Sequence, residues 1–315
     1  MGKVLITFPI FSNYLDELKK KHYVEILPYA KPLGEDFFLE RVEGFDALII
    51  LLSQKITKRV IDKGKNLKII ANYAVGYDNI DVEHASKKGI YVTNTPDVLT
   101  EATANLTWAL ILACTRRIVE SDRFTREGKF EGWKPDLFLG MDLEGKKMGI
   151  LGLGRIGYSV AKKAICFGME VFYWDIKKKK VEENIKYCKL EEILKISDII
   201  SIHLPLTKKT YHLLDRKKFD LIKKGAYIIN TARGEIVEEG ALIDALKSGK
   251  IAGAGLDVYE GEPNINKEFF KLKNVVLTPH IGSATLEART KMADLAILNV
   301  LNVLGGKEPL TKITP

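Results

Sequence analysis

Three ionisable side chains follow three apolar runs in the second half of the chain. Arg233 follows "AYIINTA", Glu262 follows "IAGAGLDVYEG", and His280 lies within "VVLTPHIGSA". A histidine can exchange a proton near neutral pH, and a guanidinium can bind a carboxylate through two parallel N–H groups. A carboxylate beside an imidazole favours the protonated ring and selects its tautomer. Each residue alone also has a structural explanation: a capping or ion-paired arginine, a loop carboxylate and a core histidine. Together, they predict acid–base chemistry on an anionic substrate.

A glycine motif precedes these residues. "GILGLGRIG" contains Gly152, Gly154 and Gly157 in G-x-G-x-x-G spacing, after an apolar run and at the start of a helical pattern. That context is the one a dinucleotide site requires. Gly152 would make the tight turn, Gly154 would let the backbone approach a pyrophosphate, and Gly157 would permit close helix–strand packing. The phosphates would bind at the helix N-terminus.

The residue at the end of the next apolar run indicates which dinucleotide is preferred. Asp175 lies eighteen residues after Gly157, where a carboxylate accepts hydrogen bonds from the adenosine ribose and repels a 2′-phosphate. We therefore predict a preference for NAD(H). Lys177 and Lys178 nearby would soften that preference and allow use of NADP(H).

The two signals fit one reaction. A dihydronicotinamide delivers hydride to a carbonyl carbon, and the developing alkoxide needs a proton that a histidine can supply. A guanidinium can hold the carboxylate of a 2-keto acid while polarising its carbonyl. In an open α/β sheet, ligands bind beyond the carboxyl ends of the strands. Asp257 and His203 also lie at such ends.

The elements that position these residues alternate along the chain. Short apolar runs separated by amphipathic stretches are typical of βαβ units and a parallel sheet. One series of expected strands covers 4–8, 47–52, 67–75 and 89–94, and a second covers 148–154, 169–175, 198–204, 226–232, 251–258 and 275–281. Between the two series, residues 99–128 have one long helical pattern, with Thr100 placed as N-cap and Gly128 as the stop. A final amphipathic helix is expected over 286–306, ending at Gly305 and Gly306.

Size and composition exclude several classes of protein. A chain of 315 residues with 46% hydrophobic and 29% charged residues predicts two globular α/β domains. Three cysteines without a CxxC pair fit a reducing cytoplasm, and no apolar stretch has membrane-spanning length. The net charge is +8, but the basic run at 177–180 lacks interleaved aromatic residues. We therefore predict a cytoplasmic protein that binds neither nucleic acid nor membrane, and we expect no metal.

The motifs resemble those of the D-isomer-specific 2-hydroxyacid dehydrogenases. "GILGLGRIG", "SIHLPLTKKT", "INTARGEIV", "AGAGLDVYEGEP" and "LTPHIGSAT" match family signatures in order and spacing, over nearly the whole chain. The resemblance implies that Arg233 binds substrate, that His280 is the acid–base group and that Glu262 is its partner. It also implies a substrate loop in "AVGYDNID", whose backbone N–H groups around Val75 and Gly76 hold the carboxylate, joined by Ser53. The implied cofactor contacts, besides the three glycines and Asp175, are Thr103, Arg155, Ile156, His203, Pro205, Thr210, Thr231, Ala232, Asp257, Gly282 and Ser283.

The family's architecture implies two Rossmann-like domains with parallel sheets, the nucleotide-binding domain inserted into the substrate-binding domain. The substrate-binding, flavodoxin-like domain would comprise 1–98 and 287–315, and the dinucleotide-binding domain 99–286. Family members are usually homodimers built through the long helix and the loop around Trp133.

Within the family, "TNTPDVLTEATANLTWALILA" and "GWKPDLFLGMDL" look most like glyoxylate/hydroxypyruvate reductases. In that subgroup, the segment equivalent to Trp133 and Pro135 reaches toward the partner's active site. The resemblance therefore implies NAD(H)-dependent reduction of glyoxylate to glycolate or of hydroxypyruvate to D-glycerate. One alternative is a D-3-phosphoglycerate or other 2-hydroxyacid dehydrogenase, for which Lys55 or Arg41 would supply a phosphate contact. A second is a non-enzymatic, NADH-sensing interaction protein.

Overall fold

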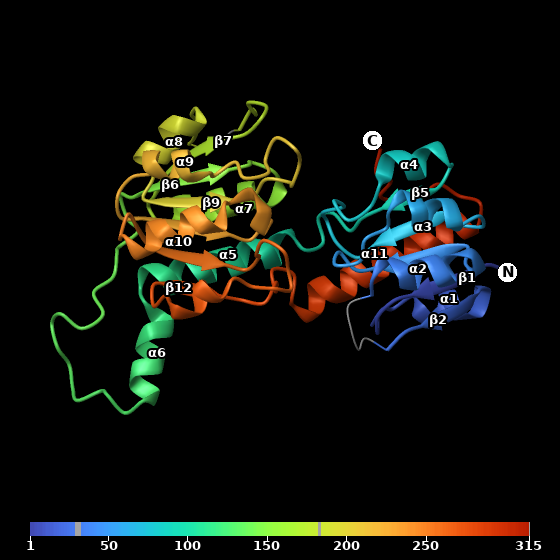
Figure 1. The fold of residues 1–315 in the computed structure, drawn as a ribbon, viewed down its shortest axis with the longest axis horizontal. Coiled ribbons are helices and arrows are strands. Elements are labelled where there is room, and N and C mark those ends of the chain that lie inside the picture. The colour runs from blue at the N-terminus through green and yellow to red at the C-terminus, as the bar shows by residue number, and fades with distance from the viewer. Residues whose placement is uncertain (29–32, 182–183, 315) are drawn as a thin grey trace. The chain divides into compact units, whose positions relative to one another are not determined.

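The computed structural model describes residues 1–28, 33–181 and 184–314, and this part of the chain divides into two compact units. Unit 1 comprises residues 1–99 and 283–315, and unit 2 comprises residues 100–282 (Figure 1). Unit 2 is therefore inserted in the sequence of unit 1. None of the helices in the described ranges combines the length and apolar character that crossing a membrane requires.

Unit 1 is built on a parallel five-stranded sheet. Its strands are β1 (Lys3–Ile6), β2 (Tyr23–Ile26), β3 (Ala47–Ile50), β4 (Ile69–Asn72) and β5 (Tyr91–Thr93), in the order β2-β1-β3-β4-β5. Its helices are α1 (Leu15–Lys21), α2 (Glu35–Arg41), α3 (Lys58–Lys63), α4 (Val82–Lys87) and α11 (Leu286–Leu304). The strand order is that of flavodoxin-like sheets. The long final helix α11 packs on β3 and β4 and is followed by Gly305, as predicted.

Unit 2 is built on a parallel seven-stranded sheet. Its strands are β6 (Lys147–Leu151), β7 (Glu170–Trp174), β8 (Ile185–Tyr187), β9 (Ile199–Ile202), β10 (Ala226–Asn230), β11 (Ile251–Leu256) and β12 (Val275–Leu277). The order β12-β11-β10-β9-β6-β7-β8 reverses between β6 and β9, which is the Rossmann arrangement with one added strand. The predicted α/β class, with two parallel sheets and an inserted domain, is confirmed.

The core of unit 2 lies on both faces of its sheet. Successive residues of a strand point to opposite faces, so Ile150 packs with α5 (Thr100–Thr115) and α7 (Arg155–Cys166), whereas Leu151 packs on the opposite face. That second face is covered by α8 (Leu190–Ile196), α9 (Arg216–Leu221) and α10 (Glu239–Lys247). Burial on both faces explains why these strands appear in the sequence as continuous apolar runs.

The single helix predicted over 99–128 is wrong. The chain forms α5, which begins at Thr100 itself, and then α6 (Ile118–Arg126), with a break at Arg117 in the left-handed region (φ 54°). Arg117 is held there by Glu120 (Nε to Oε2, 2.7 Å), and its guanidinium lies 5.0 Å from the ring centre of Phe138. Phe138 lies 21 residues further along the chain, so the break depends on a contact made only in the folded protein. No glycine or proline at this position indicates it in the sequence. Strands β2 and β8 were also missed.

Candidate active site

The glycine-rich turn joins β6 to α7. A Cβ added at Gly152 (φ 96°) would lie 2.7 Å from the carbonyl oxygen of His203, and one at Gly157 would lie 2.1 Å from the carbonyl oxygen of Gly152. These two glycines are therefore required by the packing of the protein itself.

Gly154 has a different environment. It is exposed, its φ of −73° suits any residue, and an added Cβ would have no atom within 4 Å. It precedes α7 and offers no side chain to cap the first-turn N–H groups of that helix. The open space above a glycine at a helix N-terminus fits a pyrophosphate. The turn residues, with Arg155 and Ile156, therefore fit the predicted dinucleotide.

Asp175 lies directly after β7 and contacts the same turn. Its Oδ2 accepts a hydrogen bond from the backbone N–H of Leu153 at 3.0 Å and lies 3.0 Å from the ammonium of Lys179. The Lys179 ammonium also donates to the carbonyl oxygen of Leu153 at 2.6 Å. The cation beside Asp175 is therefore Lys179, and not Lys177 or Lys178 as predicted from the sequence. Four consecutive lysines carry no signal of which one turns back to Asp175.

His280 and Glu262 form a direct pair. His280 Nδ1 lies 2.8 Å from Glu262 Oε2, and Glu262 Oε1 accepts from the backbone N–H of Tyr259 at 3.0 Å. Burial acts to raise the pKa of Glu262, but the hydrogen bond and charge of His280 outweigh it and hold that pKa below its usual range. Glu262 is therefore ionised at neutral pH and fixes the orientation of the ring through Nδ1, so that Nε2 is the ring nitrogen that Glu262 does not contact.

The turn that carries His280 is held by Asp257. The buried Asp257 carboxylate accepts from Ile281 N and Gly282 N, both at 2.8 Å, and from Thr278 Oγ1 at 2.6 Å. Burial raises the pKa of Asp257 despite these hydrogen bonds. His280 itself has φ of 54°, an uncommon backbone conformation for a non-glycine residue. Asp257 thus fixes the strained turn from which the histidine projects.

Arg233 follows β10, the strand that pairs with β11. A Cβ at the neighbouring Gly234 would lie 1.9 Å from the carbonyl carbon of Tyr259, so this segment packs directly on the loop that leads to Glu262. The charge of Arg233 contributes to the lowered pKa of Glu262. Because β11 also pairs with β12, the three predicted catalytic residues are brought together at adjacent strand ends.

The other predicted cofactor residues of unit 2 also lie at strand ends or on α5. Thr231 Oγ1 lies 2.9 Å from Thr107 Oγ1, and an added Cβ at Gly282 would lie 3.3 Å from the Thr103 side chain. Burial lowers the pKa of His203 to about 3, so its ring is neutral and is no candidate for the proton donor. The remaining residues are the exposed Pro205, the buried Thr210, whose hydroxyl donates to the Pro205 carbonyl at 2.6 Å, and Ala232, whose N–H donates to Asn230.

The predicted substrate residues Ser53, Val75 and Gly76 belong to unit 1, in the loops after β3 and β4. Ser283 is the first residue of the segment that returns to unit 1. Arg41, considered as a phosphate contact, instead forms an ion pair with Glu25 at 2.7 Å.

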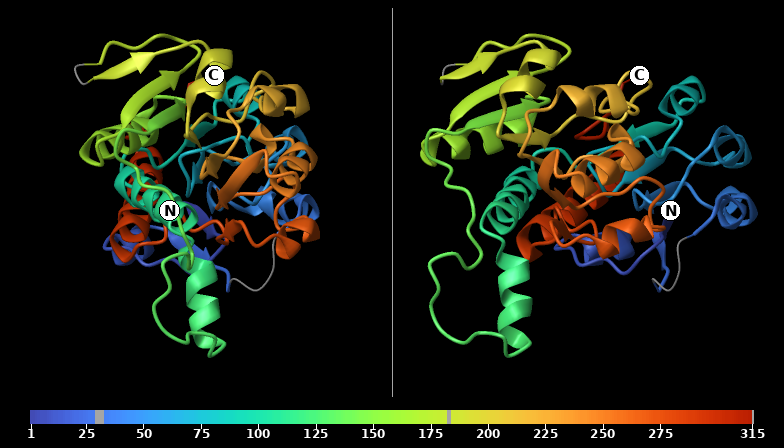
Figure 2. Two further views of the ribbon diagram at one scale, coloured as in Figure 1. Left: turned by 90° about the vertical axis from the view of Figure 1, so that its left-hand side faces the viewer. Right: turned by 60° about the vertical axis from the view of Figure 1, so that its left-hand side comes forward.

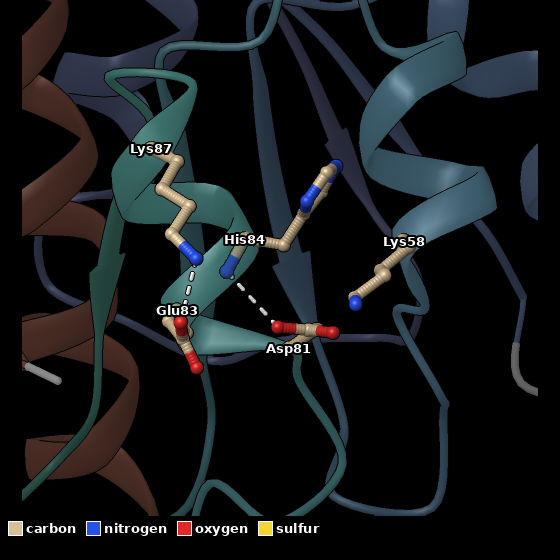
Figure 3. A pocket seen from close by; sticks show the side chains of 5 residues that line it. All are labelled: Lys58, Asp81, Glu83, His84 and Lys87. Carbon is tan, nitrogen blue, oxygen red and sulfur yellow. Dashed lines mark hydrogen bonds and ion pairs between the residues drawn. The ribbon is translucent and has the colours of Figure 1, made fainter.

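A small pocket that sequence analysis did not predict lies in unit 1 between α3 and α4 (Figure 3). His84 N donates to Asp81 Oδ1 at 2.9 Å, and Lys87 Nζ contacts Glu83 at 2.6 Å. Most of its polar groups thus serve helix capping and an ion pair within α4, so we assign it no function.

The Rossmann sheet has an open glycine turn after β6 and a histidine–glutamate pair after β11 and β12. This is the arrangement of a dinucleotide-dependent dehydrogenase. Residues 108–282 match the family described as D-isomer specific 2-hydroxyacid dehydrogenase, NAD binding domain. The chain belongs to the D-isomer-specific 2-hydroxyacid dehydrogenase family.

Its relatives are similar over their full length. Glyoxylate reductase of Thermococcus litoralis is 52% identical over 98% of this chain and 95% of its own, and that of Thermococcus gammatolerans is 48% identical over 99% and 95%. A solved structure of a protein from Thermus thermophilus has a TM-score of 0.94 at 44% identity, covering 99% of this chain and 100% of that one. The NADPH-dependent glyoxylate/hydroxypyruvate reductase of Sinorhizobium meliloti, solved with NADP and malonate, has a TM-score of 0.88 at 30% identity, covering 99% and 97%.

Proposed function

We propose that this protein is a glyoxylate reductase that also reduces hydroxypyruvate, with His280 as proton donor, Glu262 as its partner and Arg233 as a substrate contact. The observation that carries the proposal is the 2.8 Å contact between His280 and Glu262, which follow β12 and β11 at the same edge of the parallel sheet as the dinucleotide turn. Full-length relatives named glyoxylate reductase support the choice of substrate.

The proposed chemistry is a balanced addition to a carbonyl group. When bound, the dihydronicotinamide supplies a hydride, that is, two electrons and a hydrogen nucleus, to the carbonyl carbon. The protonated His280 ring gives its Nε2 proton to the carbonyl oxygen, and Glu262 stabilises the cationic ring before transfer. The Arg233 guanidinium offers N–H donors to the substrate carboxylate and the carbonyl oxygen. The product is the 2-hydroxy acid.

We propose that NAD(H) is preferred and that NADP(H) is tolerated. The Asp175 carboxylate favours a ribose with free hydroxyls. Asp175 alone would repel a 2′-phosphate. The Lys179 ammonium lies 3.0 Å from that carboxylate, so it offsets the negative charge and reduces the repulsion.

We also propose a homodimer that forms through an arm comprising residues 118–139. The arm leaves the sheet of its own unit, as both views of Figure 2 show for α6 and the segment after it. It exposes Ile118, Val119, Phe130, Trp133 and Leu139, with Trp133 84% exposed. A pocket of the same unit, lined by apolar residues such as Val119 and Val276 and by charged ones such as Arg117 and Lys273, lies beside the base of the arm. Exposed apolar side chains gathered on one such arm favour its burial against a second copy.

The test compares oxidation of NADH and of NADPH with glyoxylate, hydroxypyruvate, pyruvate and phosphohydroxypyruvate at equal concentrations. We expect the highest kcat/KM with NADH and glyoxylate. A preference for phosphohydroxypyruvate would instead assign a phosphoglycerate dehydrogenase. Binding of NADH without turnover of any keto acid would indicate a sensor.

A further inference from the structure

The loop after β4 is tethered at three successive carbonyl groups. The carbonyl oxygen of Ala74 accepts from the backbone N–H of Thr95 at 2.9 Å. The next two carbonyls bind asparagine side chains instead: Val75 O accepts from Asn94 Nδ2 and Gly76 O from Asn72 Nδ2, each at 2.8 Å. All three tethers come from the ends of β4 and β5 within unit 1.

These tethers determine where the loop's N–H groups point. In a trans peptide, the C=O and N–H bonds point in opposite directions. Each tether therefore turns the following N–H, those of Val75, Gly76 and Tyr77, away from the tethering group. Within the described residues of unit 1, none of these three N–H groups donates a hydrogen bond. The loop thus presents three successive unpaired donors, a pattern suited to an anion.

The tethers are themselves held rigidly. Asn72 is 1% exposed and exchanges hydrogen bonds with the buried Asn79, at 3.1 and 3.2 Å. Asn79 also donates to the carbonyl oxygens of Leu51 and Gln54, on the loop after β3 that contains Ser53. A glycine peptide rotates easily because it lacks a Cβ. Without Asn72, the Gly76 carbonyl would be free to turn its oxygen toward a bound anion and repel it.

We infer that Asn72 and Asn94 are positioning residues that keep the N–H groups of residues 75–77 directed at the carboxylate of the 2-keto acid. The inference rests on the proposed function. It means that two side chains orient a binding loop whose donors are all backbone N–H groups. Val75 and Gly76 were predicted from the sequence but neither asparagine was, because the tethers form only when β4 and β5 lie side by side.

The test uses Asn94→Ala and Asn72→Ala in the full-length enzyme, with Asn66→Ala as the matched control. Asn66 also donates its amide to a backbone carbonyl of unit 1, that of Glu43 at 3.0 Å, but does not contact the loop. Loss of one oriented donor to a charged group predicts roughly a tenfold weaker carboxylate contact. We expect KM for glyoxylate to rise about tenfold with kcat changed less than threefold. Calorimetric titration of oxalate into the enzyme–NADH complex should show a similar loss of affinity. The Kd of NADH and the Tm should match those of the Asn66→Ala control.

Unchanged oxalate affinity and unchanged KM in Asn94→Ala would overturn the inference, as would a loss of NADH binding equal to that of oxalate. If the buried Asn72→Ala variant fails to fold, the partly buried Asn94 still decides the question. Failure of the proposed function has a different readout. In that case the wild-type enzyme would not reduce glyoxylate, whereas the inference is judged by the oxalate affinity of the variants relative to the wild type.

Discussion

Two histidines of unit 2 each contact a glutamate, and only one of them is proposed to act on substrate. His280 Nδ1 lies 2.8 Å from Glu262, and His212 Nε2 lies 2.9 Å from Glu260. We expect His280→Asn to lower kcat by about 10² to 10⁴, since a positioned proton donor is worth that much, with the Kd of NADH changed less than twofold. His212→Asn should keep kcat within twofold. Steady-state kinetics and NADH fluorescence titration measure both, and equal effects of the two substitutions would disprove the assignment of His280.

We expect the ammonium of Lys179 to influence cofactor selectivity. Lys179→Met removes the ammonium beside Asp175, so we expect the Kd of NADPH to rise about tenfold, the value of roughly one charge-assisted contact. The Kd of NADH should change less than threefold. Lys178→Met is the control, because the Lys178 ammonium lies 5.8 Å from the ring centre of Tyr187. If Lys178→Met raised the Kd of NADPH more than Lys179→Met does, Lys178 would be the residue that affects selectivity, as predicted from the sequence.

At the scale of elements, the β6–α7 turn separates a glycine required for packing from one that leaves room for a ligand. Gly154→Ala adds a methyl group to open space, so the Tm should stay within about 2 °C while the Kd of NADH rises tenfold or more. Gly157→Ala places a methyl group 2.1 Å from a backbone oxygen, so we expect destabilisation of about 1 to 3 kcal/mol. Thermal melts and NADH titration distinguish the two effects. NADH binding by Gly154→Ala at wild-type affinity would mean that no phosphate lies over this turn.

At the scale of the whole molecule, the arm predicts the state of association. Light scattering should give twice the 35.4 kDa mass of one chain. The double substitution Trp133→Ser with Leu139→Ser removes two exposed apolar side chains, and each loss counts twice in a two-fold interface. We therefore expect this variant to be monomeric at micromolar concentration. Phe270→Ser, at a position 62% exposed elsewhere in unit 2, should remain dimeric. A wild-type monomer would exclude the proposed dimer.

The sequence by itself determined most of the elements and the residue types of the site. Apolar runs with burial on both faces predicted most strands, and the glycine spacing with Asp175 predicted the dinucleotide turn, because these signals are set by neighbours along the chain. Only the tertiary structure decided that α5 ends before Arg117, that Lys179 rather than Lys178 contacts Asp175, and that Asn72 and Asn94 hold the loop after β4. Each of these depends on a backbone turn or a hydrogen bond between segments that meet only after folding. Local sequence preferences cannot specify such a contact, because its free energy comes from the partner that the fold brings beside it.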